Sequence, residues 1–159
     1  MSVVRLNHAV LFVSDLGRAA AFYREVLGFV TVSEEPGFNA VFLKAAGTGN
    51  HHDLGLFGLG PAAEPKRRSQ VGLYHLAWQV ATIDDLVAAR ERLVAAGGYT
   101  GESSHGATKS IYGADPDGNE LEIMWLVPRE AWGEYETQAV VERLDLAAEL
   151  ERWAGVATA

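Results

Sequence analysis

One order of elements is predicted twice along this chain, and this internal repeat restricts the fold more than any other feature of the sequence. Each copy begins with a strand rich in Val, Leu or aromatic residues, continues with a helix, and ends with short strands separated by turns. His8 and His75 occupy equivalent positions 67 residues apart, and the Gly-Asn pairs at 49–50 and 118–119 are 69 residues apart. Near-constant offsets of this size indicate two copies of one βαβββ unit, with a period far longer than that of a solenoid.

Helix caps and stops support this division. Ser14 and Asp15 precede a helix over 16–27 that Gly28 ends, and Thr82 precedes a helix that runs to about residue 96 and stops at two glycines. The predicted strands are 3–13, 29–34, 39–44 and 52–59 in the first copy, and 73–80, 109–113 and 120–127 in the second, with a poorly marked strand near Tyr99. The second copy therefore repeats the first with one weak element.

A length of 159 residues fits a single domain with a substantial core. We expect one α+β domain over 1–159, with module one at about 3–59, a linker at about 60–70 and module two at about 71–127. The apolar spacing after Pro128 predicts a C-terminal amphipathic helix over about 134–153. This helix is expected to pack on the modules or on a second subunit.

The charge balance excludes several classes of partner. A formal net charge of -8 and the lack of a basic run argue against nucleic acid and against an anionic membrane surface. The chain has no cysteine, so disulfides and thiolate metal sites are excluded. We find neither a signal-peptide pattern at the N-terminus nor an apolar run of about 18 residues, so we expect a soluble, cytoplasmic protein.

Three residues form the candidate metal site. His8 and His75 each lie within a predicted strand, and Glu122 lies in the apolar stretch 121–125 of the last strand. A carboxylate is costly to bury unless a positive group compensates it, and a divalent metal would do so. Two imidazoles and one carboxylate on one face leave open coordination positions, which is the arrangement of non-haem Fe(II) oxygenases. Strand alternation places Glu120 on the same face as Glu122.

Three segments carry a resemblance to a known family: Leu6–Leu16, Phe22–Phe29 and Asp115–Glu122. In combination they resemble the vicinal-oxygen-chelate superfamily, which includes glyoxalase I, extradiol ring-cleaving dioxygenases and bleomycin-resistance proteins. The resemblance implies two βαβββ modules whose curved, cup-shaped mixed sheet surrounds a metal, with His8, His75 and Glu122 at the positions of the ligands. It also favours a homodimer.

Further features are similar to extradiol dioxygenases in particular. His52 matches their acid-base histidine beside the metal ligands, Tyr112 their tyrosine that contacts the catecholate, and His105 their other pocket histidine, although its spacing to Tyr112 is shorter here. The resemblance thus implies Fe(II)-dependent cleavage of a catechol-like small molecule, with His52, His105 and Tyr112 as catalytic residues. Histidine suits proton transfer near neutral pH, and a tyrosine hydroxyl can donate to a developing phenolate-like oxygen.

Two other functions stay open at this point. A glyoxalase-like lyase or isomerase would take a fourth ligand near His52 or Asp53, and Ni, Zn or Co would suit such a site, with Mn as a further alternative metal. A binding protein that sequesters a drug or metabolite is the third possibility. The sequence leaves the substrate, the native metal and the identity of a fourth ligand undetermined.

Overall fold

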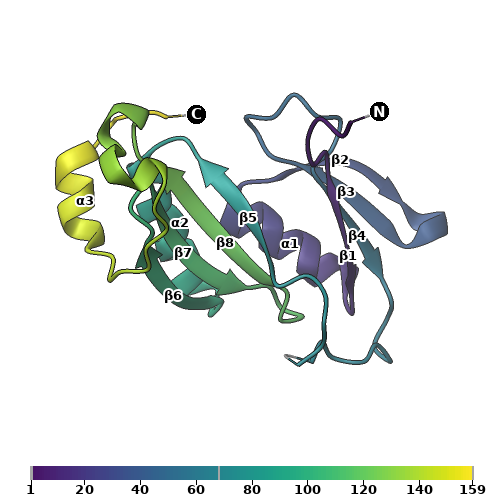
Figure 1. Cartoon of the computed structure of the whole chain (residues 1–159). Helices are drawn as coiled ribbons and strands as arrows, with labels where there is room; N and C mark the ends of the chain where they lie inside the picture. The colour runs from purple at the N-terminus through teal and green to yellow at the C-terminus, as the bar shows by residue number, and fades with distance from the viewer. Residues whose placement is uncertain (1, 68, 159) are drawn as a thin grey trace. The chain divides into compact units, whose positions relative to one another are not determined.

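The computed structural model describes residues 2–67 and 69–158, and the chain divides into two compact units (Figure 1). The first unit comprises the described residues up to Ser69 together with the turn Asp115–Gly118. The second comprises Gln70–Ala114 and the chain from Asn119 onwards. Each unit contains one four-stranded mixed sheet with helical elements, so the α+β class and the repeated order of elements are confirmed.

The first unit follows the βαβββ order. Its elements are β1 (Ala9–Val13), α1 (Leu16–Leu27), β2 (Val30–Glu35), the 3-10 turn η1 (Pro36–Phe38), β3 (Ala40–Lys44) and β4 (Leu54–Gly58). The strand order is β1-β4-β3-β2, in which β1 runs parallel to β4 and the other neighbours are antiparallel. Helix α1 packs against β3 and β4, and their buried residues form the core of this unit.

Local signals set the ends of α1, as predicted. The Asp15 side chain accepts a hydrogen bond from the backbone N–H of Arg18 at 2.9 Å, which satisfies one free donor of the first turn. Gly28 adopts the left-handed conformation with φ 70° that ends the helix. Between these ends the helix buries one apolar face: Ala19, Ala20, Phe22, Tyr23 and Val26.

The turn Asp115–Gly118 belongs to the first unit, where its carboxylates bind Tyr23 on α1 and Ser14 just before this helix. Asp117 accepts the backbone N–H of Ser14 at 3.0 Å and also its hydroxyl. The buried Tyr23 hydroxyl donates to Asp115 at 3.1 Å, and burial together with this carboxylate raises the pKa of Tyr23. This turn, which begins the segment Asp115–Glu122 of the family resemblance, therefore also has a structural role.

The second unit repeats the order and adds a C-terminal segment. Its elements are β5 (His75–Val80), α2 (Ile83–Ala95), β6 (Tyr99–Ser104), β7 (Thr108–Ala114), β8 (Glu120–Leu126), the 3-10 turns η2 (Arg129–Ala131) and η3 (Gly133–Glu136), and α3 (Leu146–Trp153) (Figure 1). The strand order is β5-β8-β7-β6, with β5 parallel to β8. Thr82 and Asp85 form a capping box at the start of α2.

The predicted helix over 134–153 is too long. Only Leu146–Trp153 is α-helical, and Asp145 starts it by accepting the Ala148 backbone N–H at 3.1 Å. The preceding chain contains the 3-10 turn η3 and then a non-helical stretch, in which Glu142 forms a backbone bridge with Ser104 at the end of β6. Across the part of the chain that the structure describes, no helix has both the length and the apolar character needed to span a bilayer.

The first strand is shorter than predicted, and this changes the place of two histidines. The ladder between β1 and β4 begins at the pair Ala9 and Leu54, so His8 and His52 lie in the connections just before these strands. The residues before Ala9 do not join the ladder. Their side chains bind the loop before β4 instead, where Asn50 accepts hydrogen bonds from side chains in this leading segment.

Candidate functional site

The register of the second sheet brings polar side chains from neighbouring strands to one of its faces. Cross-strand neighbours point to the same side of a sheet, and Tyr112 on β7 is paired with Glu122 on β8 and Gly101 on β6. Alternation along β8 places Leu121 and Ile123 on the opposite face, where both are buried. One face of the sheet therefore packs against α2 and forms the core, and the other face carries polar side chains. Strand alternation had predicted this polar face for Glu122.

His75 and Glu122 form the centre of this polar face. His75 Nε2 lies 3.1 Å from Glu122 Oε2, and the two side chains are 27% and 13% exposed. His75 Nδ1 is buried without a hydrogen-bond partner among the described residues. Two ligands held about 2.1 Å from one metal at a right angle are about 3 Å apart, so the pair fits two positions of a divalent metal site.

Tyr112 and His105, two of the predicted catalytic residues, are brought together beside this pair. His105 Nε2 lies 2.7 Å from the Tyr112 hydroxyl, and the rings of His75 and Tyr112 have centroids 6.1 Å apart. His105 is the first residue after β6, and its side chain is half-buried. The shorter spacing between His105 and Tyr112 is therefore compatible with direct contact across the β6–β7 hairpin.

The structure adds two groups that the sequence reasoning missed. The Ser103 hydroxyl lies 2.9 Å from His105 Nε2 and 3.3 Å from the Tyr112 hydroxyl, and the Val140 carbonyl oxygen lies 2.8 Å from His105 Nδ1. Ser103 could have been found, because it lies only two residues before His105, near the end of β6. A backbone carbonyl 35 residues away leaves no signal in the sequence.

In the first unit the structure brings the other two predicted residues together. The rings of His8 and His52 have centroids 4.5 Å apart, and His8 Nδ1 lies 2.9 Å from the Asn7 side-chain oxygen. His51 is exposed, and its Nδ1 lies 3.1 Å from His52 Nδ1. A third histidine therefore lies beside the His8–His52 pair.

The surroundings of His52 favour its neutral form. The pKa of His52 is lowered, mainly because the ring is partly buried and to a smaller extent because His8 and His51 lie close to it. We expect an NMR titration of the metal-free protein to give His52 a midpoint below the ordinary value of about 6.5. Since the unfolded chain takes up this proton at higher pH, the free energy of unfolding should fall as the pH drops through about 6.5. A midpoint above this ordinary value would contradict the prediction.

Asp53, the alternative fourth ligand, is engaged elsewhere. It is 7% exposed, and its carboxylate accepts the Ala45 backbone N–H at 2.9 Å and the Asn50 side-chain amide at 2.8 Å. Both carboxylate oxygens thus hold the loop before β4. Of the two alternatives from the sequence, His52 is the one whose side chain lies against His8.

An aromatic surface adjoins His52 on the first sheet. Phe42 on β3 packs against His52 with centroids 5.0 Å apart, and Phe57 on β4 lies 6.0 Å from Phe42 and 6.4 Å from Phe12 on β1. Phe12 is 68% exposed within the chain, so this surface is apolar and open. By contrast, Trp125 is fully buried in the core of the second unit beside Trp153.

The three-ligand set therefore stays a prediction. His8 belongs to the first unit, whereas His75 and Glu122 belong to the second. Within the described ranges, neither unit by itself gathers three side chains of the kinds that bind metals. Each unit supplies part of the predicted set: one histidine next to His52 in the first, and the histidine–carboxylate pair in the second.

A repeated βαβββ unit, with histidines at equivalent places and a glutamate on the last strand, defines the class of protein to which the resemblance pointed. The sequence profile of the Glyoxalase/Bleomycin resistance protein/Dioxygenase superfamily matches residues 5–123. The chain belongs to this superfamily.

Comparisons with individual proteins agree with this assignment. Biphenyl-2,3-diol 1,2-dioxygenase 3 of Rhodococcus globerulus is 36% identical over 121 residues, covering 75% of this chain and 62% of that protein. Biphenyl-2,3-diol 1,2-dioxygenase of Pseudomonas sp. (strain KKS102) is 35% identical over 131 residues, which cover 76% of this chain and 41% of that protein. The chain thus spans less than two thirds of the length of either dioxygenase.

A solved structure is similar to most of the chain. The glyoxylase/bleomycin resistance protein/dioxygenase domain from Frankia sp. EAN1pec has a TM-score of 0.65 and 25% sequence identity. The match covers 79% of this chain and 100% of that domain. The C-terminal segment with α3 lies beyond the residues that the superfamily profile matches.

Proposed function

We propose that this chain catalyses Fe(II)-dependent extradiol cleavage of a catechol-like aromatic ring. The observation that carries the proposal is the His75–Glu122 pair next to the hydrogen-bonded Tyr112 and His105 on one sheet face. These are residues that the resemblance to extradiol dioxygenases implies. The names of the two Rhodococcus and Pseudomonas relatives support the same reaction, although the superfamily also contains enzymes with other chemistry.

His8 would join His75 and Glu122 to hold the metal. A divalent metal bound by two imidazoles and one carboxylate supplies open coordination positions at which an aromatic diol and dioxygen meet. Two nitrogens and one carboxylate oxygen suit Fe(II), and they also accommodate Mn. The homodimer and the identity of the metal stay predictions of this proposal.

The remaining residues would manage protons and orient the ring. His52 is held neutral by its surroundings, and its Nδ1 faces His51, so its Nε2 is the atom that would take a proton from the substrate and return it. The Tyr112 oxygen would orient a substrate hydroxyl, and the His105 imidazole, which is hydrogen-bonded to Tyr112, would hold that oxygen in place. Phe42, which packs against His52, offers an apolar contact for the ring.

Anaerobic loading with Fe(II), followed by a panel of catechols in air, tests the proposal. We expect oxygen uptake in step with the appearance of a yellow ring-cleavage product, and loss of both when a chelator removes the metal. Uptake without the yellow product, or no uptake with any member of the panel, would contradict ring cleavage. Tight binding of an aromatic without metal or turnover would indicate a sequestering protein instead.

His52→Phe separates proton transfer from metal binding. Because positioned acid-base catalysis contributes about 10²–10⁴-fold, we expect kcat to fall by this order while the metal content stays unchanged. His51→Phe is the matched control, since His51 is the exposed neighbour in the same loop, and its kcat should change little. Loss of metal from the His52→Phe protein would show that His52 is a ligand.

The contact between His8 and His52 is the specific observation that favours a second candidate, a glyoxalase-like lyase or isomerase. His52 as a fourth ligand would complete a site suited to Ni, Zn or Co, at which a proton next to a carbonyl is abstracted. Turnover of a hemithioacetal with Ni or Zn, together with metal loss in His52→Phe, would favour this candidate over the dioxygenase.

A further inference from the structure

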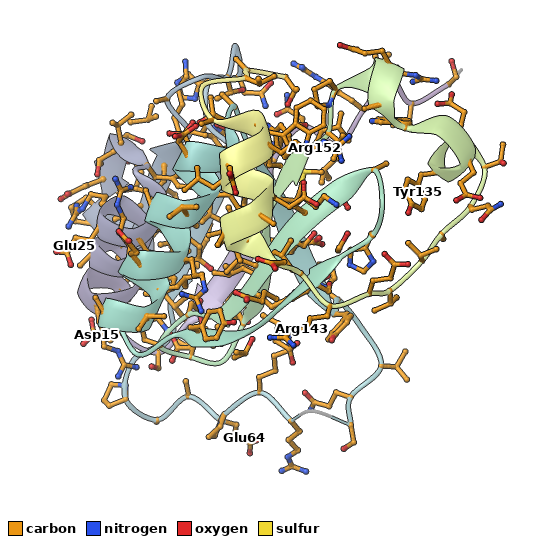
Figure 2. All side chains as sticks on the ribbon, turned by 90° about the vertical axis from the view of Figure 1, so that its left-hand side faces the viewer. Asp15, Glu25, Glu64, Tyr135, Arg143 and Arg152 are labelled. Atoms are coloured by element: carbon orange, nitrogen blue, oxygen red, sulfur yellow. The ribbon has the colours of Figure 1, made fainter. Side chains whose placement is uncertain are left out.

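The C-terminal segment contacts the turn that carries His105 in three ways. The first contact is a backbone bridge, in which Ser104 and Glu142 exchange N–H···O hydrogen bonds of 2.9 Å each. This isolated bridge pairs the last residue of β6 with a piece of chain from outside the sheet. The segment therefore follows the β6–β7 hairpin closely, and Figure 2 labels Tyr135 and Arg143 on this segment.

The second contact is made by Tyr135 with Gly106. Gly106 has φ 74°, a conformation that side chains rarely adopt, and a Cβ atom at this position would overlap the Tyr135 ring. The ring thus lies directly on the backbone of the residue after His105. Glycine is required here both for the turn and for this close approach.

The third contact determines which ring nitrogen of His105 carries the hydrogen. The Val140 carbonyl oxygen lies 2.8 Å from His105 Nδ1. A carbonyl oxygen can only accept, so Nδ1 must carry the hydrogen, and Nε2 of the neutral imidazole is left as an acceptor. At 2.7 Å, the Tyr112 hydroxyl is the nearer of the two groups that can donate to Nε2.

We propose that the segment 135–142 is a positioning element that holds His105 in the Nδ1-protonated form through the Val140 carbonyl. The bridge at Ser104 and the ring on Gly106 hold the carbonyl in place. The functional meaning of this element rests on the proposed dioxygenase function, but the tautomer itself does not. The segment lies outside the residues that the superfamily profile matches.

The direction of the hydrogen bonds follows for Tyr112. The Tyr112 hydroxyl donates a hydrogen bond to His105 Nε2, and its oxygen accepts a hydrogen bond from the Ser103 hydroxyl at 3.3 Å. One lone pair is left, so Tyr112 presents an acceptor to the polar face. This refines the expectation from the sequence, in which Tyr112 donates to a developing oxyanion. A ligand hydroxyl that still carries its hydrogen is the group that fits.

Long-range ¹H–¹⁵N spectra of the ¹⁵N-labelled, full-length, metal-free protein test the element directly. We expect the His105 ring to give the pattern of an Nδ1-protonated imidazole. Tyr135→Ala removes the ring from Gly106, and Glu142→Pro removes the N–H that Ser104 accepts. In each variant the pattern should change to a mixture of both tautomers. Val141→Ala is the matched control, because this side chain is 80% exposed, and it should keep the native pattern.

An Nε2-protonated His105 in the native protein would overturn the proposal. So would the native pattern in both variants, since the segment would then not determine the tautomer. Glu142→Pro disturbs the backbone, whereas Tyr135→Ala changes only a side chain. Should the proline variant unfold, the Tyr135→Ala spectrum decides by itself: a mixture of tautomers supports the element, and the native pattern overturns it.

The spectra distinguish this element from the reaction proposed for the site. If the native protein shows the Nδ1-protonated pattern and both variants lose it, the positioning element is supported. If in addition no catechol is cleaved, only the proposed function is contradicted. If catechols are cleaved, kcat in both variants should fall by about 10-fold or more, a part of the ~10²–10⁴-fold that positioned proton transfer contributes.

Discussion

Glu122→Gln should abolish tight metal binding and, with it, oxygen uptake with catechols. Glutamine keeps the size of the side chain but removes the charge that offsets a divalent cation. Replacing an outer-shell partner of a metal ligand costs about 10–100-fold in affinity, so loss of a ligand should weaken binding by more than about 10²-fold. Calorimetric titration of the metal-free protein with Mn(II), and of the anaerobic protein with Fe(II), measures this change.

Glu120→Gln is the matched control for this prediction. Glu120 lies on the same strand and the same face as Glu122, and its backbone is the cross-strand neighbour of His75. It is Glu122, however, whose carboxylate oxygen lies 3.1 Å from His75 Nε2. We therefore expect Glu120→Gln to bind metal almost as the native protein does. Equal losses in the two variants would mean that the acidity of the face, and not one ligand, attracts the cation.

Those parts of the fold that depend on short-range signals were predictable from the sequence. The caps at Asp15 and Thr82 and the glycine stop at Gly28 act within a few residues, so α1 and α2 were placed almost to their ends. The alternation along β8 was equally local, and it assigned Glu122 to the polar face. The weakly marked β6 forms because it pairs along its length with β7, which is tertiary information.

The parts that were wrong depend on contacts between distant segments. An amphipathic pattern over 134–153 predicted one long helix, but the bridge between Ser104 and Glu142 gives the chain another way to satisfy its backbone. His8 was placed within a strand because β-prone residues precede it, and His52 because it directly precedes the strand residues of β4. Pairing of Ala9 with Leu54, which depends on the register of the sheet, sets the true start of both strands.

For the candidate site, the sequence identified side chains but not the groups that orient them. The predicted residues meet in pairs, His75 with Glu122 and His105 with Tyr112. The Val140 carbonyl could not be found, since every residue has one and only the path of the chain brings this one to His105. The same path brings a carboxylate on α3 to a buried lysine on β7.

Lys109→Met should lower the free energy of unfolding by about 3–5 kcal/mol, the usual cost of removing one member of a buried ion pair. The Lys109 ammonium lies 2.7 Å from Glu149 Oε1 and 2.9 Å from the Ser104 hydroxyl, and its side chain is only 10% exposed. Without it, the Glu149 carboxylate on α3 loses its positive partner while 19% exposed. Urea unfolding followed by tryptophan fluorescence measures the loss.

The double variant Lys109→Met/Glu149→Leu shows whether the penalty comes from the unpaired carboxylate. Replacing a buried ion pair by apolar residues of similar size is often neutral or stabilising, so the second change should restore much of the stability that the first removes. Arg129→Met is the control for an exposed pair, because its side chain is 70% exposed where it meets Glu136, and it should cost no more than about 1 kcal/mol. If Lys109→Met costs no more than Arg129→Met, then this pair does not hold α3 to the sheet, and other contacts of the C-terminal segment, among them the Ser104–Glu142 bridge, fix its path beside His105.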